Sequence, residues 1–251
     1  MISARLIRIF AYPDGDGLDD WGEMPAAELM SGKPKQRGRY CFNAPDMGLS
    51  AGVWDCTAFA TKMAAYSADE FMILLAGSVT ITEAGGHVTR ANAGESFIIP
   101  RGLECAWAQE GYVRKIFVIY ENPAMPIPVN PAAQHVIKLD LAASLSPCGG
   151  PDPMLLNGPE PRCTERVVYT DASGQFTVGL WSGSPYDRKA SAFGRYELMH
   201  FLAGQVELHD GGNSGQAFRS GETIFVPKGA PVGWRNTSDV KKIFAILMPN
   251  S

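Results

Sequence analysis

One segment of this chain occurs twice, and the repetition restricts the possible folds more than any other feature. Glu70-Phe-Met-Ile-Leu-Leu-Ala-Gly77 returns in similar form as Glu197-Leu-Met-His-Phe-Leu-Ala-Gly204, 127 residues later. The same displacement relates Gly52 to Gly179 and further glycines, tryptophans and prolines as far as Tyr120, without insertion or deletion. Two copies kept in register over this length predict two similar domains in tandem.

Within each copy the pattern is one of short strands separated by turn residues. Residues 79–82 alternate in polarity, Gly85 and Gly86 mark a turn, and residues 113–120 form a longer apolar strand. This spacing is typical of an all-β sandwich or small barrel. Residues 6–9 and 136–139 are also similar, at a displacement of 130, which predicts a leading strand before each barrel that packs on the neighbouring barrel.

The domain boundaries follow from changes in composition. We expect an N-terminal barrel with its leading strand at 1–122 and a C-terminal barrel at 164–251. Residues 123–163 are rich in proline and include the second leading strand. A proline-rich tether is stiff and extended, so it is expected to hold the two barrels in one arrangement.

Composition excludes several classes of partner. A net charge of −4 and a pI near 5.6 without a basic stripe argue against nucleic acid. Arg5 and Arg8 interrupt what would be the apolar part of a signal peptide, and the apolar runs are too short for a membrane helix. We therefore expect a cytoplasmic protein without membrane contact, whose five cysteines, which include no C-x-x-C pair, are reduced.

Two further motifs carry a family resemblance. Gly94-x5-Pro100-x-Gly102 and Gly221-x5-Pro227-x-Gly229 each follow a Glu-x6-Gly segment. Together they resemble the two signature motifs of the cupin superfamily, in both halves of the chain. The resemblance implies a bicupin, a tandem duplicated double-stranded β-helix or jelly-roll barrel. With Trp54, Trp107 and Lys115, the pattern is similar to the ureidoglycine-aminohydrolase-type cupins, a group with many uncharacterised members.

The resemblance implies a metal site of three histidines and a glutamate, and here the chain departs from it. In the first half, the positions expected for the first two histidines hold Ala64 and Tyr66 or, with the alternative spacing, Met63 and Ala65. In the second half, they hold Ser191 and Phe193 or Ala190 and Ala192. The position of the last histidine holds Cys105 in the first half and Val232 in the second. Glu70, Cys105 and Tyr66 could supply three donors, but such a set without imidazole is rare. We therefore expect no metal and no other cofactor.

Strand parity raises a question about an apolar face. If Glu70 points into the barrel, Met72 and Leu74 do too, which leaves Phe71, Ile73 and Leu75 on the outside. An apolar outer face must be covered. The cover is either another part of the same chain or a second copy in a homodimer.

The candidate site residues lie mainly in the first half. Glu70 is the candidate catalytic residue, as a general acid or base, although it could instead be a structural group paired with a lysine or a tryptophan N–H. Candidate ligand-binding residues are Tyr66, Cys105, Trp107 and Trp54, with Glu197 and Trp234 in the second barrel. Because Phe193 and Val232 replace Tyr66 and Cys105, we expect the more polar site in the first barrel.

Three functions remain open. The first is a metal-free, small-molecule-binding bicupin that acts as a sensor or accessory protein in small nitrogen-compound metabolism. The second is a hydrolase or isomerase of the ureidoglycine-aminohydrolase type. The third is a structural dimer without a ligand. The sequence favours the first, because barrel mouths are common ligand pockets.

Overall fold

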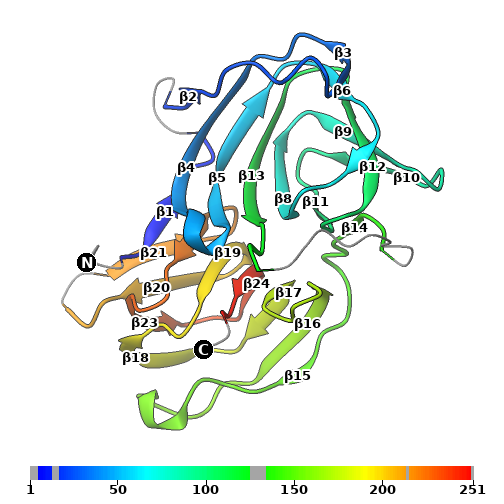
Figure 1. The fold of residues 1–251 in the computed structure, drawn as a ribbon. Coiled ribbons are helices and arrows are strands. Elements are labelled where there is room, and N and C mark those ends of the chain that lie inside the picture. The colour runs from blue at the N-terminus through cyan, green and yellow to red at the C-terminus, as the bar shows by residue number, and fades with distance from the viewer. Residues whose placement is uncertain (1–4, 13–16, 125–133, 213–214, 250–251) are drawn as a thin grey trace. The chain divides into compact units, whose positions relative to one another are not determined.

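The computed structural model describes residues 5–12, 17–124, 134–212 and 215–249. These residues form two compact units. One unit contains Phe10–Leu139, and the other contains Met1–Ile9 together with Asp140–Ser251. Within the described residues the regular structure is almost entirely β, which agrees with the all-β prediction (Figure 1).

The first unit contains two antiparallel sheets. The larger has the order β14-β11-β8-β13-β5-β4-β2, and the smaller has the order β10-β9-β12-β6-β3, with β7 beside β12. The strands are β2 (Asp19–Asp20), β3 (Leu29–Gly32), β4 (Gln36–Ala44), β5 (Leu49–Cys56), β6 (Phe59–Thr61), β7 (Ala64–Ala65), β8 (Asp69–Ala76), β9 (Ser78–Glu83), β10 (Val88–Asn92), β11 (Ser96–Ile99), β12 (Glu104–Gln109), β13 (Val113–Tyr120) and β14 (Ile137–Lys138), with one 3-10 turn, η1 (Pro45–Met47).

The second unit repeats the larger sheet strand for strand. Its order is β1-β22-β19-β24-β17-β16-β15, and its smaller sheet is β18-β23-β20-β21. The strands are β1 (Ile7–Ile9), β15 (Ser146–Cys148), β16 (Cys163–Thr170), β17 (Phe176–Gly183), β18 (Tyr186–Ala192), β19 (Tyr196–Ala203), β20 (Gln205–His209), β21 (Gly215–Arg219), β22 (Thr223–Val226), β23 (Pro231–Asn236) and β24 (Val240–Leu247), with one 3-10 turn, η2 (Pro153–Leu155).

The ungapped displacement of 127 is confirmed in the strand registers. Val113 lies opposite Cys56 in β13 and β5, and Val240 lies opposite Gly183 in β24 and β17. The same agreement holds between β8 and β11 and between β19 and β22. The two barrels are therefore built from equivalent strands at equivalent positions.

The leading strands correct the predicted domain boundaries. β1, which we expected in the N-terminal domain, pairs with β22 of the second unit, while β14 pairs with β11 of the first. Each leading strand thus completes the barrel of the other half, as the packing prediction required. Residues 125–133 of the predicted tether lie outside the described residues.

A charge pair fixes each leading strand to its barrel. Lys138 Nζ donates to Glu95 Oε1 at 2.7 Å, and Arg8 pairs with Glu222 in the second unit. Glu95 and Glu222 are the glutamates of the repeated Gly-Glu motif. In both halves, the glutamate of this motif therefore forms the ion pair that holds a leading strand against the barrel.

Two of the three apolar side chains on the outer face of β8 are buried within a single chain, and the third, Leu75, is partly buried. Phe71 is 0% and Ile73 is 3% exposed. Met72 and Leu74 point the other way, into the barrel core. A second copy is not needed to bury Phe71 and Ile73, so this face gives no support to a homodimer, which stays a prediction.

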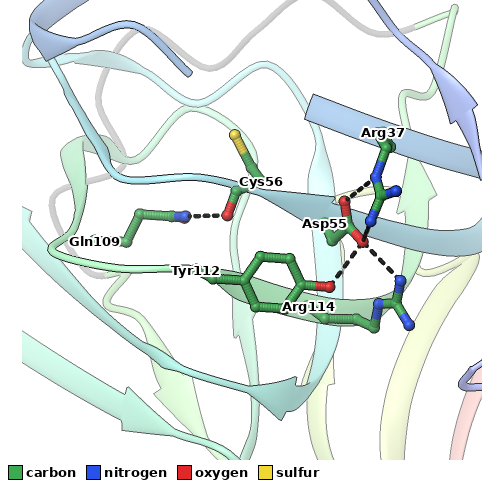
Figure 2. Close-up of polar contacts among 6 residues, drawn as sticks. All are labelled: Arg37, Asp55, Cys56, Gln109, Tyr112 and Arg114. Atoms are coloured by element: carbon green, nitrogen blue, oxygen red, sulfur yellow. Dashed lines mark hydrogen bonds and ion pairs between the residues drawn. The ribbon is translucent and has the colours of Figure 1, made fainter. Parts of the chain in front are cut away.

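A buried cluster of charges joins three strands of the first unit (Figure 2). Asp55 on β5 is 1% exposed and accepts hydrogen bonds from Arg37 on β4, Arg114 on β13 and Tyr112, at 2.7–3.1 Å. Burial raises the pKa of the Asp55 carboxyl, but the two guanidinium groups and the phenol outweigh it and hold the pKa below its usual value. Residue 182, the equivalent position in the second barrel, is a serine, so only the first barrel carries this cluster.

We predict that Gly77→Ala and Gly204→Ala destabilise the protein much more than Gly94→Ala. All three glycines have positive φ, but a Cβ at Gly77 or Gly204 would lie 2.1 or 2.2 Å from a backbone carbonyl oxygen, whereas none lies within 4 Å at Gly94. The control should lose about 1–2 kcal/mol from backbone strain alone, and Gly77→Ala about 3 kcal/mol or more. Urea unfolding measures both, and equal losses would contradict the crowding argument.

We also predict that Asp55→Asn lowers the free energy of unfolding at pH 7 by about 1.5–3 kcal/mol. Because the folded pKa is lowered, the stabilisation is present above the unfolded carboxyl value of about 4 and is lost as pH falls through the folded value. The difference between wild type and variant should therefore shrink below about pH 4. Glu110→Gln on the surface is the control, and a pH-independent difference would count against the charge pairing.

Candidate functional site

The first barrel encloses a cavity of about 690 Å³. Five of the candidate residues line it: Trp54, Tyr66, Glu70, Cys105 and Trp107. Trp54 lies on β5, Tyr66 lies just after β7, Glu70 lies on β8, and Cys105 and Trp107 lie on β12. The structure therefore brings together the first-half residues that the sequence selected.

A buried ion pair lies at the base of this cavity. Lys115 Nζ on β13 donates to Glu70 Oε1 at 2.7 Å, and it also lies 3.3 Å from Met72 Sδ. Glu70 is 5% and Lys115 is 7% exposed. A buried charge without a partner is costly, so the lysine provides the compensation that the sequence required for Glu70.

Tyr66 completes this group from the cavity wall. Its hydroxyl donates to Glu70 Oε2. Desolvation raises the pKa of the Tyr66 phenol well above its usual value, and the Glu70 carboxylate raises it further. Tyr66 is therefore a neutral donor, and both oxygens of Glu70 are engaged.

Two tryptophans form an aromatic wall beside the ammonium group. Lys115 Nζ lies 4.7 Å from the ring centroid of Trp54 and 4.9 Å from that of Trp107. The Trp107 indole N–H donates to Gln109 Oε1 at 2.9 Å. Gln109 Nε2 in turn lies within hydrogen-bonding distance of the backbone carbonyl oxygens of Cys56, Thr57 and Gly111. Figure 2 shows the bond to Cys56. This amide fixes the ring that faces the cavity.

Cys105 is a poor nucleophile in this setting. It is 5% exposed, and burial raises the pKa of its thiol to about 11, with a further contribution from Glu83. The neutral thiol dominates at physiological pH. Cys105 therefore contributes a small, weakly polar surface to the cavity.

The second barrel has a smaller cavity of about 290 Å³ with the same ion pair. Lys242 Nζ donates to Glu197 Oε1 at 2.6 Å beside Trp181 and Trp234. The second oxygen of Glu197 accepts a hydrogen bond from Arg195 Nε at 2.8 Å. Burial opposes ionisation of Glu197, but Lys242 and Arg195 hold its pKa below the usual value.

Two arginines correct the expectation that the first barrel holds the more polar site. Phe193 does line the cavity, but so do Arg188 and Arg195. The equivalent residues of the first barrel are Thr61 and Ala68. Sequence reasoning compared only the positions of the metal-binding motif, and it missed both arginines because they lie at other positions of β18 and the following turn.

The residues present do not suit a divalent cation. Within the described part of the chain, no group of three or more His, Cys, Asp or Glu side chains lies close enough to hold a metal ion. In each barrel a lysine ammonium contacts the motif glutamate, where it would repel a cation. The His200 side chain does not line the second cavity. Its Nδ1 lies 2.8 Å from Thr223 Oγ1, and burial lowers the pKa of its imidazole to about 4.

The chain belongs to the family of EutQ-like cupin domains. That family model matches twice, at residues 43–117 and 170–244, which together span more than half of the chain at the displacement of the repeat. The protein is therefore a bicupin with two tandem cupin barrels. None of the curated proteins matches it in sequence.

Several solved structures share this fold. A protein of unknown function from Pseudomonas syringae pv. tomato, in the DUF861 family, is 25% identical with a TM-score of 0.79 and covers 97% of this chain and 100% of its own. A cupin 2 conserved barrel domain protein from Leptotrichia buccalis is 10% identical, with a TM-score of 0.59 over 93% and 99% of the two chains. YlbA from E. coli, also of DUF861, is 9% identical, with a TM-score of 0.53 over 99% and 93%.

Among the residues that the structure describes, no helix has the length and apolar character needed to cross a membrane.

We predict that the purified protein contains far less than one zinc, iron or manganese ion per chain. The reason is the absence of histidine at every expected ligand position, together with the lysine that pairs with each motif glutamate. Elemental analysis of protein purified without chelators measures the content. Close to one metal ion per chain that disappears in Glu70→Gln or Cys105→Ala would overturn the prediction.

Proposed function

We propose that this protein is a metal-free, small-molecule-binding bicupin whose principal ligand occupies the first barrel. The observation that carries the proposal is the Tyr66–Glu70–Lys115 group at the wall of a cavity of about 690 Å³. A cavity of this size, largely apolar with a few convergent polar groups, is typical of sites for small organic molecules.

The lining indicates the chemistry of the ligand. Trp54, Trp107 and Phe117 offer apolar and aromatic surface, while Glu70 and Lys115 offer one acceptor and one donor in close contact. The charged side chains that line this cavity, Glu28, Lys62, Glu70 and Lys115, balance one another. A ligand without net charge, such as a ureide or amide with an apolar part, therefore fits better than an anion. Such a ligand is consistent with a role as sensor or accessory protein in small nitrogen-compound metabolism.

An aminohydrolase of the ureidoglycine type is the second candidate function. The observation that favours it is the hydrogen bond from Tyr66 to Glu70 inside the cavity, which could orient the carboxylate as a general base toward a ureide. Ammonia release from ureides by wild type, abolished in Glu70→Gln, would support this activity. A purely structural dimer is the third candidate, and it predicts no ligand effect at all.

We predict that a ureide or amide identified in a thermal-shift screen stabilises wild type and Glu197→Gln more than it stabilises Glu70→Gln at the same ligand concentration. Bound ligand stabilises by RT ln(1 + [L]/Kd), so each shift is measured against the same variant without ligand. Loss of a charged hydrogen bond should weaken binding by about tenfold or more.

Tyr66→Phe serves as a second variant, because it removes one hydroxyl and leaves the Glu70–Lys115 pair. It should bind more weakly than wild type without a large loss of stability. If the ligand binds wild type and Glu70→Gln equally but no longer binds Glu197→Gln, the ligand site lies in the second barrel and the proposal is wrong.

A further inference from the structure

The second barrel has an unbalanced set of charges around its cavity. Arg188, Arg195 and Lys242 line it as cations, whereas Glu165 and Glu197 are the carboxylates. Glu197 is already shared between Lys242 and Arg195. Arg188 forms no ion pair among the described residues, so the cavity carries a surplus positive charge.

Arg188 is held in place but not satisfied. One terminal nitrogen donates to the Val232 carbonyl oxygen at 2.8 Å, which fixes the guanidinium against β23. Its Nε is buried and has no hydrogen-bond partner. An unsatisfied buried donor on a charged group is costly, and the guanidinium also has no carboxylate partner among the described residues, so an anion in the cavity would supply the missing opposite charge.

The neighbouring groups reinforce the need for an anion. Burial lowers the pKa of the Arg188 guanidinium, and Arg195 adds to this effect, while Tyr186 and Glu197 oppose it. Burial likewise lowers the pKa of Lys242. Glu197 opposes this shift, whereas Arg195 and Arg188 lower the pKa further. The three cations are therefore close enough to repel one another, and a bound anion would relieve that repulsion.

The shape of the cavity limits the size of the anion. The volume is about 290 Å³, less than half that of the first barrel. Tyr186 stacks on Trp234 with ring centroids 5.7 Å apart, and Phe193 also lines the space. Arg195, whose side chain is 40% exposed, is accessible to solvent, so it can meet an incoming anion. The site suits a planar carboxylate with a short apolar chain.

We propose that the second barrel binds a small monocarboxylate, held by the guanidinium groups of Arg188 and Arg195 above the Glu197–Lys242 pair. Arginine presents its donors in a planar fork that matches a carboxylate, so the two are suited in geometry as well as charge. The first barrel lacks both arginines, so the two halves would bind different ligands. This site stands independently of the proposed ligand of the first barrel.

The test is titration calorimetry of the full chain with sodium acetate, propionate and butyrate, and with acetamide as the uncharged analogue. Wild type should bind at least one of the carboxylates and not acetamide. Arg188→Gln should weaken that binding about tenfold or more. Lys189→Gln, which removes the same charge from an exposed neighbour on β18, should leave it unchanged.

Two further variants keep the test decisive. Arg188→Lys retains the charge without the fork and should bind with intermediate affinity, which separates recognition from a folding defect. Glu110→Gln, at the surface of the first barrel, should bind the carboxylate as wild type does. Equal binding of acetamide, equal competition by chloride, or unchanged affinity in Arg188→Gln would each overturn the proposal.

Discussion

A buried glutamate–lysine pair is the interaction on which the interior of each barrel depends. Glu70 and Lys115 in the first barrel, and Glu197 and Lys242 in the second, meet at 2.7 and 2.6 Å among apolar side chains. Removing one partner of such a pair typically costs about 3–5 kcal/mol, because the remaining charge is left buried. The surrounding groups follow from this requirement: a second donor satisfies the other carboxylate oxygen, and two tryptophans lie beside each ammonium group. In each pair the lysine ammonium contacts the motif glutamate, where it would repel a metal cation.

The two halves differ in the second group that donates a hydrogen bond to the glutamate. In the first barrel a phenol, Tyr66, bonds to the glutamate, and the cavity is large and close to neutral. In the second a guanidinium, Arg195, takes this place, and Arg188 adds a further cation to a smaller space. One scaffold thus carries two cavities that differ in volume and in the charge of the side chains that line them. Duplication supplied the shared backbone, and a few substitutions on the cavity walls separated the two sites.

The scaffold itself is held by features that recur in both halves. Gly77 and Gly204 allow the close approach of a neighbouring carbonyl oxygen. Gln109 and Asn236 each accept a tryptophan N–H and donate to the adjacent loop. Glu95 and Glu222 bind the leading strands. These repeated contacts explain why the 127-residue displacement tolerates no gap: each residue is tied to partners on other strands, and a shift of one position would turn its side chain to the opposite face.

The sequence by itself determined the tandem cupin fold, the equivalence of the strands and the residues that gather in the first cavity. It could do so because strand alternation, turn glycines and an ungapped repeat are properties of local order along the chain. The tertiary structure alone decided which lysine partners each glutamate, which barrel each leading strand completes, and that Phe71 and Ile73 are buried within one chain. It also revealed Arg188 and Arg195 at the second cavity, residues without any motif. Such features depend on contacts between strands far apart in sequence, and no local pattern records the distance between two side chains.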